Sequence, residues 1–255
     1  GGATFTIVSG DDFTSGTRDI ATVESITAAA TDQIISITTH ATAFTDGIVT
    51  IDLSGDTNAT GANVIDVSND DGDEAWTLTG SAGVDTITGD GGIDTITGGG
   101  GADVIDGGAG NDIFKYSTTA QLVASNALVD SLTGGSGTDT IQLTAATGTT
   151  LTLASTDLIE ARMATMESIT AGVSAGVLSI TASAALFSDG VVTIDLSGDT
   201  SATGANIIDV SNDDGSEAWT LTGSAGVDTI TGDGGIDTIS GGGGADVIVG
   251  GAGAD

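Results

Sequence analysis

The sequence has 255 residues, of which 36 are acidic and only three are basic, and its formal net charge is −33. With so few cationic side chains to neutralise phosphates, the composition argues against binding to nucleic acid and against membrane insertion. The 42 glycines, the abundant β-branched residues and the lack of proline and cysteine predict short strands and tight turns without disulfide bonds.

The first 79 residues contain short segments in which apolar and polar residues alternate. The clearest are Gln33–His40, Ile48–Ser54 and Asn63–Ser68, and turn-forming pairs such as Asp46-Gly47 lie between them. A period of two is expected of a strand that buries one face. The segments recur at intervals of roughly 10–15 residues, which favours the coils of an irregular β-solenoid.

A nonapeptide of the form Gly-Gly-x-Gly-x-Asp-x-U-x, in which U is a large apolar residue, then follows four times without a gap. The copies begin at Gly80, Gly89, Gly98 and Gly107, and the last ends at Lys115. The eighth residue is apolar in every copy, so we expect these side chains to form a thin core between two sheets. The expected core residues are Ile87, Ile96, Ile105 and Phe114, and in a second block Ile230, Ile239 and Ile248.

The nonapeptide also carries a pattern of oxygen ligands. Six glycine-rich turn residues and a three-residue strand make half a coil, so two copies would close one turn of 18 residues. Glycine allows backbone carbonyl groups to converge on one point, and the aspartate at position six adds negative charge. Hard oxygen ligands of this kind are preferred by Ca²⁺. The turn preference of aspartate does not explain a strict spacing of nine, so the pattern predicts calcium sites.

After the first block the pattern breaks, and Thr118–Asn126 and Asp157–Met166 are predicted to form short helices. Between them Gly134–Gln142 restarts the nonapeptide, and a degenerate copy just before it keeps Asp130 and Leu132. We therefore interpret this part of the chain as a connector that contains remnants of the repeat.

A longer repeat includes all of these elements. Residues 44–112 align without gaps to residues 187–255, which lie 143 positions later, and 61 of the 69 aligned residues are identical. Repeats of this kind are typical of solenoids and arrays. We expect the chain to be a segment of a longer protein, with a first unit at 1–143 and an incomplete second unit at 144–255. The expected parts are a solenoid at 1–79, a β-roll at 80–116, a connector at 117–143, a second solenoid at 144–222 and a second roll at 223–255.

The nonapeptides resemble those of the RTX (repeats-in-toxin), or hemolysin-type, calcium-binding family, and the tandem units resemble those of giant adhesins, S-layer proteins and extracellular filaments. The resemblance implies an all-β fold, a right-handed parallel β-solenoid with calcium-binding β-roll blocks and minor short helices. It also implies several Ca²⁺ ions, each shared by loops 18 residues apart. The implied aspartate pairs are Asp85 with Asp103, Asp94 with Asp112, Asp228 with Asp246, and Asp237 with Asp255. The glycines implied to bind through backbone carbonyls are Gly80, Gly89, Gly91, Gly98, Gly100, Gly107, Gly223, Gly232, Gly234, Gly241, Gly243 and Gly250.

By the same resemblance, the chain is expected to be a structural module of a secreted bacterial cell-surface or extracellular-matrix protein, exported by the type I system of a Gram-negative bacterium. It would stay unfolded in the calcium-poor cytosol and fold on binding calcium outside. Expected partners are further copies of the chain, in a filament or lattice, and cell-surface polysaccharide. The alternative is a secretion and folding module of a type I secreted enzyme such as a protease or lipase. A third reading, ice binding, is disfavoured because the loops lack a regular Thr-Gly-Asn ladder.

Two weaker features do not change this interpretation. His40 is the only histidine, and the second unit has Ser183 at the equivalent position, so a Ser-His-Asp site is not expected. The acidic stretch Asn69–Glu74 is interpreted as a solvated loop, with a capping calcium site as the alternative. No pattern in the sequence indicates catalysis.

Overall fold

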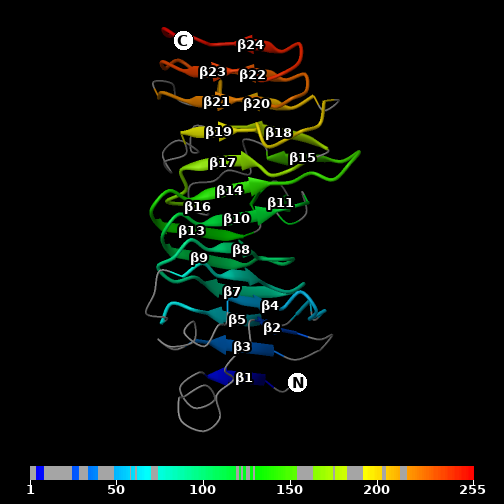
Figure 1. The fold of residues 1–255 in the computed structure, drawn as a ribbon, viewed down its shortest axis with the longest axis vertical. Helices are drawn as coiled ribbons and strands as arrows, with labels where there is room; N and C mark the ends of the chain where they lie inside the picture. The colour runs from blue at the N-terminus through cyan, green and yellow to red at the C-terminus, as the bar shows by residue number, and fades with distance from the viewer. Residues whose placement is uncertain are drawn as a thin grey trace. The chain divides into compact units, whose positions relative to one another are not determined.

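The computed structural model describes residues 4–8, 25–28, 34–39, 49–57, 59–60, 62–69, 74–118, 121, 123–124, 127–128, 130–153, 163–174, 176–182, 192–202, 205–212 and 217–255. Regular structure in these residues is almost entirely β-strand (Figure 1). The strands up to the end of the first nonapeptide block are β1 (Thr4–Val8), β2 (Ser25–Thr27), β3 (Ile34–Thr38), β4 (Thr50–Asp52), β5 (Ala62–Asp66), β6 (Thr77–Thr79), β7 (Val84–Thr88), β8 (Thr95–Thr97), β9 (Val104–Ala109) and β10 (Ile113–Tyr116). The later strands are β11 (Val123–Ala124), β12 (Ala127–Leu128), β13 (Ser131–Ser136), β14 (Thr140–Leu143), β15 (Thr150–Leu153), β16 (Met163–Ala164), β17 (Ser168–Ala171), β18 (Val177–Thr181), β19 (Thr193–Asp195), β20 (Ile207–Asp209), β21 (Thr220–Thr222), β22 (Thr229–Thr231), β23 (Thr238–Ser240) and β24 (Val247–Val249).

The chain divides into two compact units, and the first contains residues 1–114 and 129–139. Its strands fall into two parallel sheets, in the order β1-β3-β5-β7-β9-β13 and β2-β4-β6-β8-β10. From β2 to β10, successive strands along the chain alternate between the two sheets, so each coil contributes one strand to each sheet. This is the arrangement of a β-roll or β-solenoid, and it confirms the fold class predicted from the repeats.

The second unit contains residues 115–128 and 140–255 and repeats the same architecture. Its sheets run β14-β17-β19-β21-β23 and β15-β18-β20-β22-β24, and the pairings given for them are parallel. Equivalent strands of the two units have equivalent partners. Ile65 of β5 pairs with Ile87 of β7, for example, as Ile208 pairs with Ile230. The fold therefore follows the 143-residue repeat.

Within the nonapeptide blocks, the core is a narrow line of apolar side chains from the eighth position of the repeat. In β7 the strand alternation buries Asp85 and Ile87 and exposes Val84 and Thr86, so one face carries both the core residue and the aspartate. The prediction for this position is confirmed at Ile87, Ile96, Ile105, Phe114 and Ile230, all at most 1 % exposed. It is wrong at Ile248, which is 47 % exposed, and holds only in part at Ile239, which is half-buried. Both lie in outer strands of their sheets, β24 and β23, which have a paired strand on one side only.

Truncating the largest residue of this core, Phe114→Ala, is expected to lower the free energy of unfolding by about 3–5 kcal/mol, because the narrow core cannot close around the cavity. Phe114 is fully buried and pairs with Ile96 across β8 and β10. Chemical denaturation in excess calcium measures the change. The matched control is Ile93→Ala, in an exposed loop position (54 %) of the same block, which should cost much less. Equal effects of the two substitutions would contradict this assignment of the core.

The connector differs from its prediction. The helix predicted over Thr118–Asn126 is confirmed at Gln121, which is helical, and wrong at Val123–Ala124, which form β11 and pair antiparallel with β12. A β-branched residue and a neighbouring strand to pair with favour an extended backbone over a single isolated helical turn. The helix predicted over Asp157–Met166 is also wrong where the chain is described, because Met163–Ala164 form β16.

Some predictions concern residues outside the described part of the chain. They include His40, residues 70–73 of the acidic stretch and residues 157–162 of the second predicted helix. Among the described residues, no helix has the length and apolar character needed to span a bilayer.

Candidate metal centre

In the nonapeptide loops that begin at Gly80, Gly89, Gly223 and Gly232, the aspartate at position six binds back to the start of its own loop. The amide of Ser81 donates to Oδ2 of Asp85 at 2.6 Å, and the amide of Asp90 donates to Oδ2 of Asp94 at 3.1 Å. The equivalent bonds recur in the second unit. The short loop and the strand alternation together turn these carboxylates inward, and Asp85 and Asp94 are almost completely buried.

The same aspartates also connect successive coils. The amide of Asp85 donates to Oδ1 of Asp103, and the amide of Asp94 donates to Oδ1 of Asp112, each at 2.8 Å and across 18 residues. In the second unit, Asp228 donates to Asp246 at 3.0 Å and Asp237 donates to Asp255 at 3.1 Å. The structure thus brings together the four aspartate pairs that the sequence suggested. Asp246 is half-buried and Asp255 is exposed.

We call each series of aspartates joined in this way, amide to carboxylate from one coil to the next, an aspartate ladder. Two further aspartates, which sequence reasoning left out of the site, extend these ladders. The amide of Asp103 donates to Oδ1 of Asp130 at 2.9 Å, and the amide of Asp112 donates to Oδ1 of Asp139 at 2.8 Å, each across 27 residues. Both acceptors are buried. The sequence contains the signal, because Asp130 and Asp139 lie two and three nonapeptide lengths after Asp112. The intervening position is Gln121, which is outside the ladder.

The ladders begin at residues that are not acidic. Trp76 donates its amide to Oδ1 of Asp94 at 2.9 Å, where an earlier aspartate of the series would be expected. On the other ladder, the residue before the first aspartate is Asn63, which is paired in register with Asp85. The Asn63 side chain accepts the amide of Ile35 at 2.8 Å and donates to the buried carboxylate of Asp56 at 3.0 Å. Asn206 makes the same two bonds in the second unit, to Leu178 and Asp199. In each unit the uncharged side-chain amide of an asparagine therefore stands at the start of this ladder, where an aspartate would add a negative charge.

The substitution Asn63→Asp is expected to lower the free energy of unfolding by about 3 kcal/mol or more, because a donor is lost and a second buried negative charge is placed beside Asp56. Thermal or chemical unfolding in saturating calcium measures the loss. Asn63→Ala is the companion variant, since it removes the donor without adding a charge and should cost less. Equal losses for the two variants would show that repulsion between the carboxylates is unimportant here.

The first glycine of each nonapeptide lies against the carboxylate of its own loop. A Cβ added to Gly89 would overlap Oδ2 of Asp94 and the carbonyl oxygen of Gly107 one coil later. The other glycines of this position have an equivalent environment around their own aspartates: Gly80, Gly98, Gly107, Gly223, Gly232, Gly241 and Gly250. These eight predicted ligands therefore lie beside the aspartate ladders.

The third-position glycines are placed differently. Added Cβ atoms on Gly100 and Gly243 would meet the backbone of Ala82 and Ala225 at ordinary contact distance, and no carboxylate is among their nearest atoms. For Gly91 and Gly234 a ligand role stays a prediction. Sequence reasoning also missed the fourth position, where Gly110 has φ +121 and would collide with the carbonyl oxygen of Gly92 if it carried a side chain.

Burial of so many carboxylates is electrostatically costly without cations. Desolvation, with the charges of Asp130 and Asp85 adding to it, raises the pKa of Asp103 to about 8. For Asp112, desolvation and then the charges of Asp94, Asp139 and Asp90 raise the pKa to about 7. The pKa of Asp94 rises to about 6, again mainly through burial. These groups would favour protons or metal ions over bare negative charge.

The donor set fits Ca²⁺. Oδ2 of Asp103 and Oδ2 of Asp112 are buried and lack a hydrogen-bond donor in the described structure, so each is available as a ligand. No three His, Cys, Asp or Glu side chains of the described residues come close enough to form a site by themselves. Main-chain oxygens of the loops would have to complete the coordination shell, which suits a hard cation that takes six to eight oxygen ligands.

Comparison with known families agrees with this geometry. The model of the RTX calcium-binding nonapeptide repeat matches residues 79–114, 127–144 and 222–255. The middle match includes Asp130 and Asp139, the two ladder residues that sequence reasoning left out. Comparison with curated proteins and with solved structures gave no match. Repeats of this family are typical of extracellular proteins that leave the cell by type I secretion, and they bind several Ca²⁺ ions. The chain thus contains hemolysin-type RTX repeats folded as a calcium-binding β-roll.

Proposed function

We propose that the chain is a calcium-stabilised structural module of a secreted bacterial cell-surface or extracellular-matrix protein. It folds when calcium binds outside the cell, it has no catalytic activity, and it associates with further copies in a filament, S-layer or adhesin stalk. Cell-surface polysaccharide is the further partner of such an assembly.

The observation that carries the proposal is the duplication of one buried-carboxylate framework. Both units contain the aspartate ladders, the closing amides of Asn63 and Asn206, and the same coil register. A structural array gains from repeating a stable unit, since each added unit lengthens the molecule without requiring a new fold. With a net charge of −33, the chain stays expanded until cations neutralise it, so calcium outside the cell can control where it folds.

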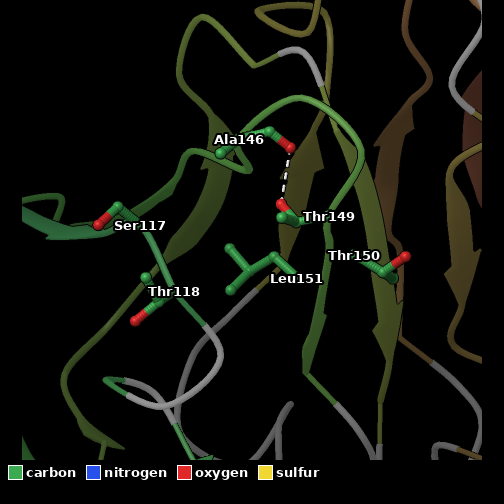
Figure 2. Close-up of a pocket in the computed structure, with 6 residues that line it drawn as sticks. All are labelled: Ser117, Thr118, Ala146, Thr149, Thr150 and Leu151. Carbon is green, nitrogen blue, oxygen red and sulfur yellow. Dashed lines mark hydrogen bonds between the residues drawn. The ribbon is translucent and has the colours of Figure 1, made fainter.

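The second unit also contains a pocket with a small polar and apolar lining. Figure 2 shows its lining, which consists of Ser117, Thr118, Ala146, Thr149, Thr150 and Leu151. The Thr149 hydroxyl donates to the carbonyl of Ala146 at 2.6 Å. Nothing in this lining can act as a general acid or base at neutral pH.

A calcium titration of the chain, followed by circular dichroism and electron microscopy, tests the proposal. We expect little β-structure in chelator, a cooperative gain with calcium, and then fibres or sheets. A calcium-folded chain that stays monomeric at all concentrations would contradict self-assembly and favour the secretion module of a type I secreted enzyme. Folding that is independent of calcium at neutral pH would contradict the mechanism as a whole.

A further inference from the structure

The second residue of the nonapeptide is a glycine in some loops and a larger residue in others. It is Ser81 and Asp90 in the first two loops of the first unit, and Ser224 and Asp233 in the corresponding loops of the second unit. The later loops have a glycine at this position: Gly99, Gly108, Gly135, Gly242 and Gly251. Loops of the two kinds differ in backbone conformation and in what they do with their aspartate.

The loops with serine or aspartate share one arrangement, which we call the closed loop. The side-chain oxygen of the second residue accepts the amide of the fourth residue, from Gly83 to Ser81 at 3.0 Å and from Gly92 to Asp90 at 2.9 Å. The corresponding bonds of the second unit measure 3.1 Å and 2.8 Å. Serine and aspartate commonly bond to an amide two residues later in turns. The neutral and the charged side chain therefore hold the loop in the same way.

The closed loop also binds the carboxylate of its own aspartate. The backbone amide of the second residue donates to Oδ2 of the sixth, from Ser81 to Asp85 at 2.6 Å and from Asp90 to Asp94 at 3.1 Å. The same bonds in the second unit measure 2.6 Å and 3.2 Å. The Ser81 hydroxyl lies a further 3.0 Å from Oδ2 of Asp85. In all four closed loops, the carboxylate thus has a donor within its own loop.

The loops with glycine at the second position have a different backbone, and we call them open loops. In one of them φ is +98 at Gly99 and +125 at the fourth residue, Gly101. The other open loops also have positive φ at both positions: Gly108 and Gly110, Gly135 and Gly137, Gly242 and Gly244, Gly251 and Gly253. In the closed loops, which the structure describes completely, neither position has positive φ.

Stacking of the coils explains where each kind of loop occurs. A Cβ on Gly99 would overlap the carbonyl oxygen of Ser81 in the previous coil, and a Cβ on Gly108 would overlap that of Asp90. The second unit repeats both contacts. The closed loops come first in their block, so no earlier nonapeptide places a carbonyl against their second residue, and a side chain fits there.

In the open loops, the second amide is turned away from the aspartate. The amide of Gly108 donates at 3.2 Å to Oδ1 of Asp106, outside its own loop, and not to Asp112. Oδ2 of Asp112 and Oδ2 of Asp103 are buried and have no hydrogen-bond donor among the described residues. Both residues are at most 1 % exposed. An open loop thus presents a carboxylate oxygen that the protein itself does not satisfy.

We propose that the second residue decides whether a nonapeptide offers its aspartate to calcium, because closed loops keep the carboxylate and open loops present it. Within the pairs, Asp103 and Asp112 then bind calcium together with main-chain oxygens, while Asp85 and Asp94 stay bonded to their own loops. The inference rests on the proposed calcium-driven folding and names the residues that set its affinity. A site with one carboxylate binds calcium more weakly than a site with two.

Glycine and alanine at the second position separate the two loop states. Ser81→Gly/Ser224→Gly removes the side-chain acceptor and permits positive φ, so calcium can draw the loop into the open state and gain its aspartate as a ligand. Ser81→Ala/Ser224→Ala is the matched control, because it removes the same hydroxyl and disfavours positive φ. Asp90→Gly/Asp233→Gly and the corresponding alanine variants repeat the comparison on the other ladder.

Calorimetric titration of each full chain with calcium measures the affinity, and circular dichroism in saturating calcium checks that each variant is folded. We expect the glycine variants to bind calcium about tenfold more tightly than the matched alanine variants. A purely structural role of the second residue predicts the reverse order, because glycine costs more conformational entropy on folding than alanine.

Glycine variants that bind calcium no more tightly than the alanine variants would overturn this inference. The proposed function would still stand if the unsubstituted chain folds on binding calcium. An unsubstituted chain that does not bind calcium would overturn the proposed function, and this inference with it.

Discussion

Acidification of the calcium-free chain from pH about 8 to about 4 is expected to restore much of its β-structure. Burial raises the pKa of Asp103 to about 8 and that of Asp112 to about 7, above the value of 3.8 for an ordinary aspartate. The folded state thus binds protons more tightly than the unfolded state. The stability that these groups contribute is fully present below pH 3.8 and is lost as the pH rises through the range from about 6 to 8.

Circular dichroism and chemical denaturation in chelator, across this pH range, measure the effect. Even after a generous discount for solvent screening, a shift of this size corresponds to about 2 kcal/mol or more for Asp103. Calcium affinity should change in the opposite sense, falling as the pH drops below about 7, because protons compete for the same oxygens. A calcium-free chain that is equally unfolded at both ends of the range would contradict this account.

The variant Asp103→Asn separates charge from geometry. The amide oxygen can still accept the amide of Asp85, while the buried negative charge is removed. We expect the calcium-free variant to be more stable than the parent at neutral pH and to bind calcium more weakly. Asp106→Asn is the control, since Asp106 is an exposed aspartate of the same nonapeptide. A variant that loses stability in chelator would show that the Asp103 charge is compensated within the protein.

Replacing Gly110 by alanine is expected to destabilise the roll by about 3–5 kcal/mol, even in saturating calcium. Gly110 has φ +121, and a Cβ there would overlap the carbonyl oxygen of Gly92 in the adjacent coil. Its amide also donates to the carbonyl of Ser136 at 2.8 Å, so the loop cannot move away without losing a bond between coils. Chemical denaturation in excess calcium measures the loss.

Two controls divide this effect into its parts. Gly148→Ala tests positive φ alone, because Gly148 has φ +75 and no atom within 4 Å of an added Cβ. Gly100→Ala tests a loop methyl group alone, because φ is not positive there and the nearest atom would be 3.6 Å away. Gly100→Ala should be nearly neutral and Gly148→Ala should cost about 1 kcal/mol. A Gly110→Ala loss no larger than that of Gly148→Ala would contradict the close packing of the loops.

The sequence by itself determined the features that depend on local spacing. A period of nine identified the loops and core residues such as Ile87, because turn and strand in this repeat are specified within a single nonapeptide. The resemblance to the RTX family supplied the aspartate pairs such as Asp85 and Asp103. The duplication likewise predicted two units of one architecture. In these cases the chemistry of a few neighbouring residues dictates the backbone, and stacking only repeats it.

Only the tertiary structure decided how the irregular parts join the ladders. Asp130 and Asp139 enter through a coil of 27 residues instead of 18, and Asn63 closes a ladder through a bond to Asp56. The register across an insertion is set by packing against the previous coil, and a sequence pattern does not contain that information. The burial of Asp90 is likewise a property of the folded state, because stacking of the coils covers it while its amide donates to Asp94.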